Sequence, residues 1–340
     1  HAELFFAFVR ITLSGFGGTL PWTRRMFVEK KKWMTAEEFN DSYALCQFLP
    51  GPASSQVGFA LGLLRGRGLL GGLAAWCGFT LPSAILLCAF ALGAAALAGP
   101  VAAGVLHGLK LVAVAVVAQA VWGMARTLTP DRPRAGIALA AVAIAVFAGG
   151  AFGQIGAIAL GAVAGLWLCR DGGGAPAGKL SVPVSRRGGG AALALFAALF
   201  LAVPALAAAT GAQGLALFDA FYRSGALVFG GGHVVLPLLQ AEVVPPGWVS
   251  NEAFLEGYGL AQAVPGPLFT FAAWLGAVMG PAPNGIVGAA IALAAIFLPG
   301  LLLLYGALPY WDALRRRPGA QSAMRGANAA VVGILGAALY

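Results

Sequence analysis

Two arginines lie inside apolar runs of the sequence, and each stands six residues before a Phe-Gly-Gly tripeptide. They are Arg10, before Phe16, and Arg223, before Phe229. A cation at membrane depth is costly, and it is usually functional or paired. A guanidinium offers several donors that match a tetrahedral oxyanion, so the pair predicts an anion-binding site. Two other interpretations stay open: snorkelling to an interface or, for Arg223, an ion pair with Asp219 one turn earlier.

Two kinds of interruption divide these apolar runs, one rich in glycine and one with the pattern Gln-x-x-Pro-Gly-Pro. A helix cannot pass through them unbroken, and the bare backbone is tolerated in a bilayer only where it faces protein or a cavity. Free backbone N–H groups at the start of the next half-helix would favour the binding of an anion there. A packing kink is the alternative, and the two glutamines could bind the anion or tie the broken segments together. The predicted residues are Gly17, Gly18, Gln47, Pro50, Gly51, Pro52 and Ala53 in the first half, and Gly230, Gly231, Gly232, Gln262, Pro265, Gly266, Pro267 and Leu268 in the second.

Lys110 and His233 complete the predicted binding residues. Lys110 lies one turn beyond His107 and is either a third cation near the site or an end-of-helix residue. His233 directly follows the second glycine-rich break, where it could donate to a substrate, take up a proton or be only structural. The four cysteines are scattered singly, so we expect no metal, no disulfide and no cofactor. Three histidines without clustered carboxylates argue against a membrane-embedded enzyme.

The elements that must position these residues occur twice. Residues 33–47 align without a gap on residues 248–262, residues 7–10 align on 220–223, and Leu81-Pro82 aligns on Leu298-Pro299. The small differences in spacing predict one fold unit used twice. The second copy stops in the middle of an apolar run at Tyr340, so we expect the native protein to continue beyond it.

Composition predicts an all-α polytopic membrane protein. The chain is 60% hydrophobic and 10% charged, with a net charge of +9 that lies mostly in loops, so a nucleic-acid partner is not expected. Expected full spans are residues 69–97, 101–124, 135–147, 154–169, 191–210 and 286–308. We expect an N-terminal repeat over 1–170, a basic glycine-rich linker over 171–190, a connecting transmembrane helix over 191–216 and an incomplete C-terminal repeat over 217–340.

Loop charge predicts that the two repeats have opposite orientations. Residues 22–42 are expected to form a cytoplasmic interfacial helix. Residues 22–38 carry five lysines and arginines, whereas residues 240–256 carry none and hold three glutamates. Basic loops stay in the cytoplasm, so the copies should lie opposite ways up. For the two repeats to be inverted, the chain must cross the membrane an odd number of times between equivalent positions in them. If every broken run is a re-entrant hairpin, five full spans precede residue 217, which is an odd number. Counting the run around Gln47 as a full span also gives an odd number, but it moves one basic loop to the wrong side.

Taken together, Phe-Gly-Gly, Trp-x-[Thr/Ser]-x-Glu-x-Phe, Gln-x-x-Pro-Gly-Pro and Leu-Pro, in this order and twice over, resemble the chromate ion transporter (CHR) family of the two-domain, long-chain type. The likeness covers roughly residues 4–125 and 217–340, and it departs from the family pattern at Thr19, where the second copy has Gly232. The resemblance implies a secondary transporter for efflux of chromate, a sulfate-like oxyanion, across the cytoplasmic (inner) membrane.

Chromate and sulfate have the same shape and charge. A sulfate carrier, or another oxyanion carrier or channel of the same fold, is therefore the alternative function. The expected partners are the oxyanion and the lipid bilayer, and both a monomer and a homodimer stay open.

Overall fold

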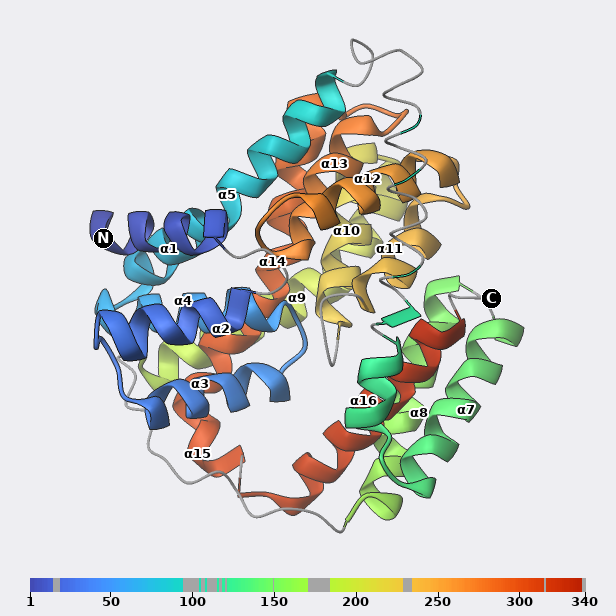
Figure 1. The fold of residues 1–340 in the computed structure, drawn as a ribbon. Coiled ribbons are helices and arrows are strands. Elements are labelled where there is room, and N and C mark those ends of the chain that lie inside the picture. The colour runs from blue at the N-terminus through green and yellow to red at the C-terminus, as the bar shows by residue number, and fades with distance from the viewer. Residues whose placement is uncertain are drawn as a thin grey trace.

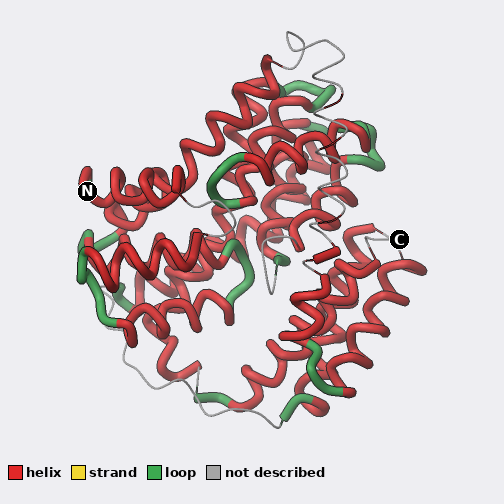
Figure 2. The backbone as a smooth tube through the Cα atoms, viewed as in Figure 1, coloured by secondary structure: helices red, strands yellow, loops and turns green. Residues whose placement is uncertain are grey.

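The structure is a computed structural model, and it describes residues 1–14, 19–93, 121–148, 150–170, 184–228, 234–314 and 316–337, with five single positions between 104 and 119. These residues form helices and connecting loops and contain no strand (Figures 1 and 2). The helices before the basic linker are α1 (Ala2–Ser14), α2 (Thr19–Arg24), the π-helix η1 (Arg25–Lys30), α3 (Ala36–Phe48), α4 (Ala53–Arg65), α5 (Leu69–Gly93), α7 (Arg132–Ala148) and α8 (Gly150–Leu168). Those after it are α9 (Arg186–Thr210), α10 (Gln213–Ala226), α11 (Val235–Val243), α12 (Asn251–Ala263), η4 (Leu268–Thr270), α13 (Phe271–Val278), α14 (Gly285–Ala307), η5 (Leu308–Tyr310), α15 (Trp311–Leu314) and α16 (Pro318–Ala337).

Three stretches of helix are long and apolar enough to cross a membrane. They are α5, α9 and the run Gly285–Leu314 that joins α14 to η5 and α15. They agree with the expected spans that begin at residues 69, 191 and 286, while most of the expected span 101–124 lies outside the described residues. Leucines on α9 point outward, with Leu201 71% exposed. An apolar surface of this kind belongs in lipid, and the protein is a membrane protein.

Two helices of equal length lead into the Pro-Gly-Pro segments. Thr35 caps α3 in a capping box with Glu38, and Ser250 caps α12 by accepting a hydrogen bond from the N–H of Ala253. Each helix has 13 residues and is closed by a backbone hydrogen bond at its C-terminal cap, at Leu49 or Val264. The Trp-x-[Thr/Ser]-x-Glu pattern is therefore a helix start, and the break follows one helix length later.

The interfacial helix expected over the basic stretch differs from what the structure shows. α2 ends at Arg24, η1 covers Arg25–Lys30 and a loop precedes α3. The last part of the expected linker is also helical, because Ser185 accepts a hydrogen bond from the N–H of Gly188 and starts α9 at Arg186. Local capping overrides the flexibility that glycine-rich composition indicates.

Helices from the two halves of the chain pack against each other. Within each half, α1 packs on α5 and α10 packs on α14. Between the halves, α13 contacts α5 and α4 contacts α14. The C-terminal helix α16 lies beside α7 and α8 of the first half (Figure 1). There Gly326 faces Gly161 and Gly165 so closely that a Cβ at Gly326 would lie 2.0 Å from the Gly161 carbonyl oxygen. Small residues allow this close backbone approach in a membrane.

Candidate functional site

The first Pro-Gly-Pro break is held by residues from the second half of the chain. Gly51 has φ +123°, and its N–H donates to the carbonyl oxygen of Val228 at 2.7 Å. A Cβ at Gly51 would lie 3.0 Å from the Cα of Gly300 in α14. The amide of Gln56 donates to the carbonyl oxygens of Pro50 and Gly300 at 2.9 and 3.0 Å. The break therefore needs glycine for both its backbone conformation and its close contact.

The second break is held in turn by residues from the first half. Gly266 has φ +136°, and the hydroxyl of Ser83 in α5 donates to the carbonyl oxygen of Pro265 at 2.6 Å. A Cβ at Gly266 would lie 1.8 Å from that hydroxyl oxygen and 3.1 Å from the Cγ2 atom of Thr12. Thr12 is itself buried near the end of α1, where its hydroxyl donates to the carbonyl oxygen of Phe79 at 2.9 Å. Each Pro-Gly-Pro break thus contacts a proline-containing helix of the opposite half, α14 or α5.

The two predicted glutamines each follow a tyrosine by one turn, but their amides differ in their contacts. The Gln47 amide donates to the Tyr43 hydroxyl. The Nε2 atom of Gln262 is buried and has no hydrogen-bond partner among the described residues. This buried donor beside the second break could donate a hydrogen bond to an anion, because a buried donor without a partner costs free energy. Gln47 has no such spare buried donor.

Arg10 lines a small cationic pocket at the end of α1. The pocket has a volume of about 90 Å³. Three of its side chains are cations, and no carboxylate is among the described residues that line it, which are Arg10, Ile11, Ser14, Trp22, Arg25, Met26 and Lys30. Like charges gathered in a small pocket raise the local potential and attract an anion.

The acidic neighbours of this pocket are already paired with other cations. Arg24 binds Glu29 at 2.9 Å, and Lys31 binds Glu3 at 2.7 Å. Arg25 lies over the Trp22 ring, 6.0 Å from its centroid. Arg10, Arg25 and Lys30 are consequently left without an ion pair to any described carboxylate. In the sequence, the basic run indicates only a cytoplasmic segment, and nothing in its spacing shows that two of its members join Arg10.

Arg223, the repeat counterpart of Arg10, has a different environment. It binds Asp219 at 2.6 Å and lies 3.6 Å from Glu242 of α11, and the three side chains are 10–19% exposed. The local ion pair that the sequence allowed is therefore formed, with a second carboxylate added. With all three ionised the cluster has a net charge of −1, which does not favour another anion. Sequence reasoning missed Glu242, and its signal was a lone acidic residue in the otherwise uncharged helix α11.

Several predicted site residues lie outside the described part of the chain. They are Gly17, Gly18, Lys110, Gly230, Gly231, Gly232 and His233. Among the described site residues, Pro52 and Pro267 are the N-terminal cap residues of α4 and η4, which begin at Ala53 and Leu268. In the structure, Gln56 and Ser83 also form hydrogen bonds at the breaks. The repeat pattern in the sequence did not point to either residue.

Comparison with known proteins gives one consistent result. The family model described as "Chromate transporter" matches residues 2–166 and 215–340. The chain is 29% identical to the chromate transport protein of Pseudomonas aeruginosa over 99% of this chain and 80% of that protein. It is 27% identical to the chromate transport protein of Cupriavidus metallidurans over 98% of this chain and 80% of that protein. No solved structure matches the chain.

Proposed function

This chain belongs to the chromate transporter family, and we propose that it is a secondary transporter that exports chromate across the cytoplasmic membrane. The observation that carries the proposal is the family match over both halves, together with two relatives named as chromate transport proteins. The family indicates transport rather than catalysis. Chromate is a tetrahedral dianion, and the pocket around Arg10 has the charge to attract such an ion.

We infer that transport uses two repeats of opposite orientation that rock against each other around the breaks. The equal lengths of α3 and α12 support this inference, as do the reciprocal contacts of each break with the opposite half. A change in the packing of α14 would be transmitted to the first break through Gln56. A change in α5 would be transmitted to the second break through Ser83.

We assign the binding step to cations of the first half and to donors at the breaks. Arg10, Arg25 and Lys30 would draw the dianion in by electrostatic attraction. The unpaired Gln262 amide and the N–H groups at the starts of α4 and η4 would then replace part of its water shell. The ion pair of Arg223 with Asp219 makes that arginine part of the scaffold in this conformation.

Chromate flux into proteoliposomes tests this proposal. The intact chain should show saturable uptake, and Arg10→Gln should lower it by about tenfold or more, because a charge-assisted hydrogen bond contributes roughly 1.5–3 kcal/mol. Arg187→Gln is the matched control, since Arg187 is an exposed arginine at the start of α9. Competition by sulfate would decide whether sulfate shares the route. No chromate flux by the intact chain, under conditions where its fold is retained, would refute the proposal.

A further inference from the structure

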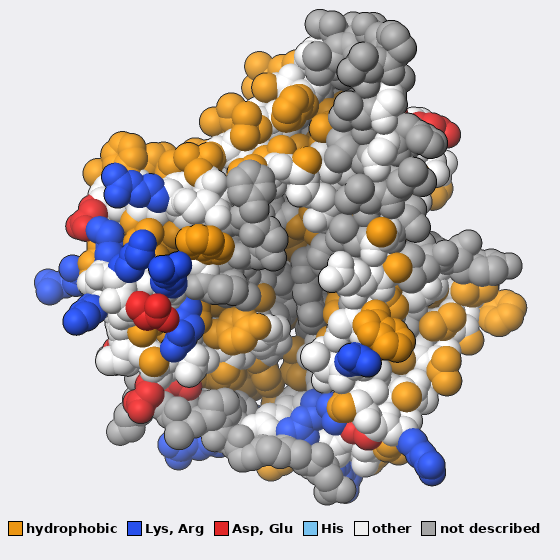
Figure 3. Space-filling view, in the orientation of Figure 1, with side chains coloured by type: hydrophobic (Ala, Val, Ile, Leu, Met, Phe, Trp, Pro, Cys, Tyr) orange, Lys and Arg blue, Asp and Glu red, His pale blue; other side chains and the backbone are white. Residues whose placement is uncertain are grey.

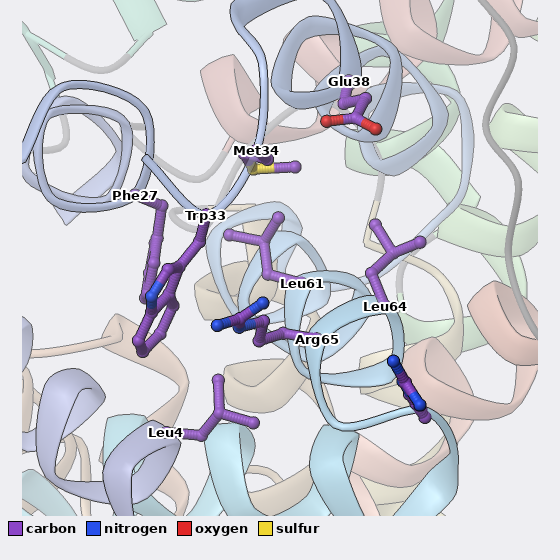
Figure 4. Close-up of a pocket in the computed structure, with 9 residues that line it drawn as sticks. Leu4, Phe27, Trp33, Met34, Glu38, Leu61, Leu64 and Arg65 are labelled. Atoms are coloured by element: carbon purple, nitrogen blue, oxygen red, sulfur yellow. The ribbon is translucent and has the colours of Figure 1, made fainter. Parts of the chain in front are cut away.

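A second and larger cavity lies among α1, η1, α3 and α4. Its volume is about 300 Å³. Six of its nine lining side chains are apolar or aromatic, with Leu4, Leu61 and Leu64 among them, and Arg65 and Arg67 supply two cations. Leu4 and Glu38 lie at opposite ends of it (Figure 4). The cavity therefore combines apolar side chains with two positively charged ones.

Aromatic rings hold one of these cations in place. Trp33 stacks on Phe27 with ring centroids 5.1 Å apart, and the Arg65 guanidinium carbon lies 5.3 Å from the Trp33 centroid. Figure 4 shows the Arg65 guanidinium beside the Trp33 ring. A cation held over a ring face keeps its N–H donors available at the ring edge. Arg65 and Arg67 form no ion pair within the described part of the chain, so both remain free to bind an anion.

The carboxylate that lines this cavity is already engaged. One oxygen of Glu38 accepts a hydrogen bond from the Thr35 N–H at 2.8 Å, as part of the capping box that starts α3. Lys31, whose Nζ atom lies 4.5 Å from the centroid of the Trp33 ring, is paired with Glu3. The two free arginines therefore set the sign of the potential at their end of the cavity.

The cavity lies where lipid-facing surface begins. α5 starts at Leu69, two residues after Arg67, and Leu69 and Leu70 are 50% and 69% exposed. Phe6 on α1 is 61% exposed. In Figure 3 hydrophobic side chains over α1 and α5 adjoin a group of lysines and arginines. A boundary between basic and apolar surface is where phospholipid headgroups lie.

We propose that this cavity binds an anionic phospholipid of the membrane. Its phosphate contacts Arg65 and Arg67, and the first carbons of its chains lie along Leu4, Leu61 and Leu64. A free inorganic anion fits the cavity poorly, because the leucines would leave part of its oxygens without hydrogen bonds. An amphiphile has an apolar part for that wall, and guanidinium groups bind a phosphate through charge-assisted hydrogen bonds.

Lipid binding to the intact, detergent-purified chain tests the proposal directly. Native mass spectrometry and thermal unfolding would be followed with phosphatidylglycerol, with phosphatidylcholine and with inorganic phosphate alone. Phosphatidylglycerol should bind and raise the melting temperature, and the other two should not. In Arg65→Gln with Arg67→Gln, the apparent Kd for phosphatidylglycerol should rise about tenfold or more. Both arginines are exposed, so the double variant keeps the fold.

Two further variants separate this site from general attraction to basic loops. Arg126→Gln with Arg132→Gln removes the same charge from exposed arginines elsewhere, and it should bind phosphatidylglycerol as the intact chain does. Arg65→Lys with Arg67→Lys keeps the charge and should retain most of the binding. Equal loss in the Arg126 and Arg132 variant would overturn the proposal, as would unchanged binding in the Arg65 and Arg67 glutamine variant. Equal stabilisation by inorganic phosphate would show a site for free anions instead.

Discussion

Arg10 and Arg223 align with each other in the sequence, yet their surroundings differ in charge. Arg10 is exposed and shares a pocket with Arg25 and Lys30. Arg223 is mostly buried between Asp219 and Glu242. The difference teaches that two arginines in matching sequence motifs take their chemistry from the helix that packs beside each of them. In the first half that neighbour is the basic π-helix η1, and in the second it is α11 with its one carboxylate.

The two arginines therefore have different roles, one in attracting an anion and one in stabilising the fold. A free cation in a pocket contributes little to the stability of the fold and much to the attraction of an anion. A largely buried cation between two carboxylates contributes to the fold, because removing it leaves two uncompensated charges. Substitutions at the two positions should therefore affect different measurements.

The largest effect is expected from Arg223→Leu. Breaking a buried ion pair from one side costs about 3 kcal/mol or more, since Asp219 and Glu242 would lose their shared partner. The melting temperature of the purified protein should fall by several degrees, and Arg10→Leu should leave it nearly unchanged. Adding Asp219→Asn and Glu242→Gln to Arg223→Leu should restore part of the loss. A similar fall in melting temperature for Arg10→Leu would remove the distinction between the two arginines.

Local signals in the sequence were enough to predict a good part of the fold. The span starting at Leu69 could be predicted because a long apolar run is visible in the sequence itself. The pairing of Arg223 with Asp219 was one of the interpretations that the sequence left open, because the two are one turn apart. The helix starts at Thr35 and Ser250 also rest on local capping residues, although the sequence predictions did not use them. Each of these features depends on residues close to one another in the chain.

Contacts between distant residues could not be predicted. Gln56 meets Gly300 across 244 residues, and Ser83 meets Pro265 across 182. Glu242 reaches Arg223 from another helix, and Arg25 joins Arg10 only because η1 folds back along α1. A single sequence holds no periodic signal for such pairs, since packing of separate helices creates them. The electrostatic character of the candidate site therefore became visible only in three dimensions.

The next largest effect is expected from Arg25→Gln with Lys30→Gln. Removing two cations from the pocket should raise the KM for chromate by about tenfold or more and weaken its dependence on ionic strength, because screened attraction is lost. Arg24→Gln with Lys31→Gln is the matched control. It removes the same charge from neighbours that are paired with Glu29 and Glu3. Proteoliposome flux at several salt concentrations measures both, and equal changes in the two variants would mean that only net charge matters.

A moderate effect on stability is expected from Gln56→Leu at the first break. The change removes the donor to two carbonyl oxygens, Pro50 and Gly300, and it also removes the side-chain oxygen of Gln56, which is buried without a partner. The net cost should be about 2 kcal/mol, since each orphaned carbonyl costs roughly 1–3 kcal/mol and the lost acceptor offsets part of it. Thermal unfolding measures this cost. Stability equal to that of the intact chain would show that the first break holds without Gln56.

The smallest effect is expected from Ser83→Ala at the second break. Only one hydrogen bond is lost there, the one to the carbonyl oxygen of Pro265, so the cost should be about 1 kcal/mol. In a chain of this size that corresponds to a fall of roughly 2 °C in melting temperature. The alanine also opens space beside Gly266, whose missing Cβ would otherwise meet the Ser83 hydroxyl. Gly266→Ala should therefore be better tolerated together with Ser83→Ala than alone, although its φ of +136° still penalises any side chain. Equal loss of stability from Gly266→Ala in both backgrounds would mean that backbone conformation, and not contact with α5, fixes glycine at this break.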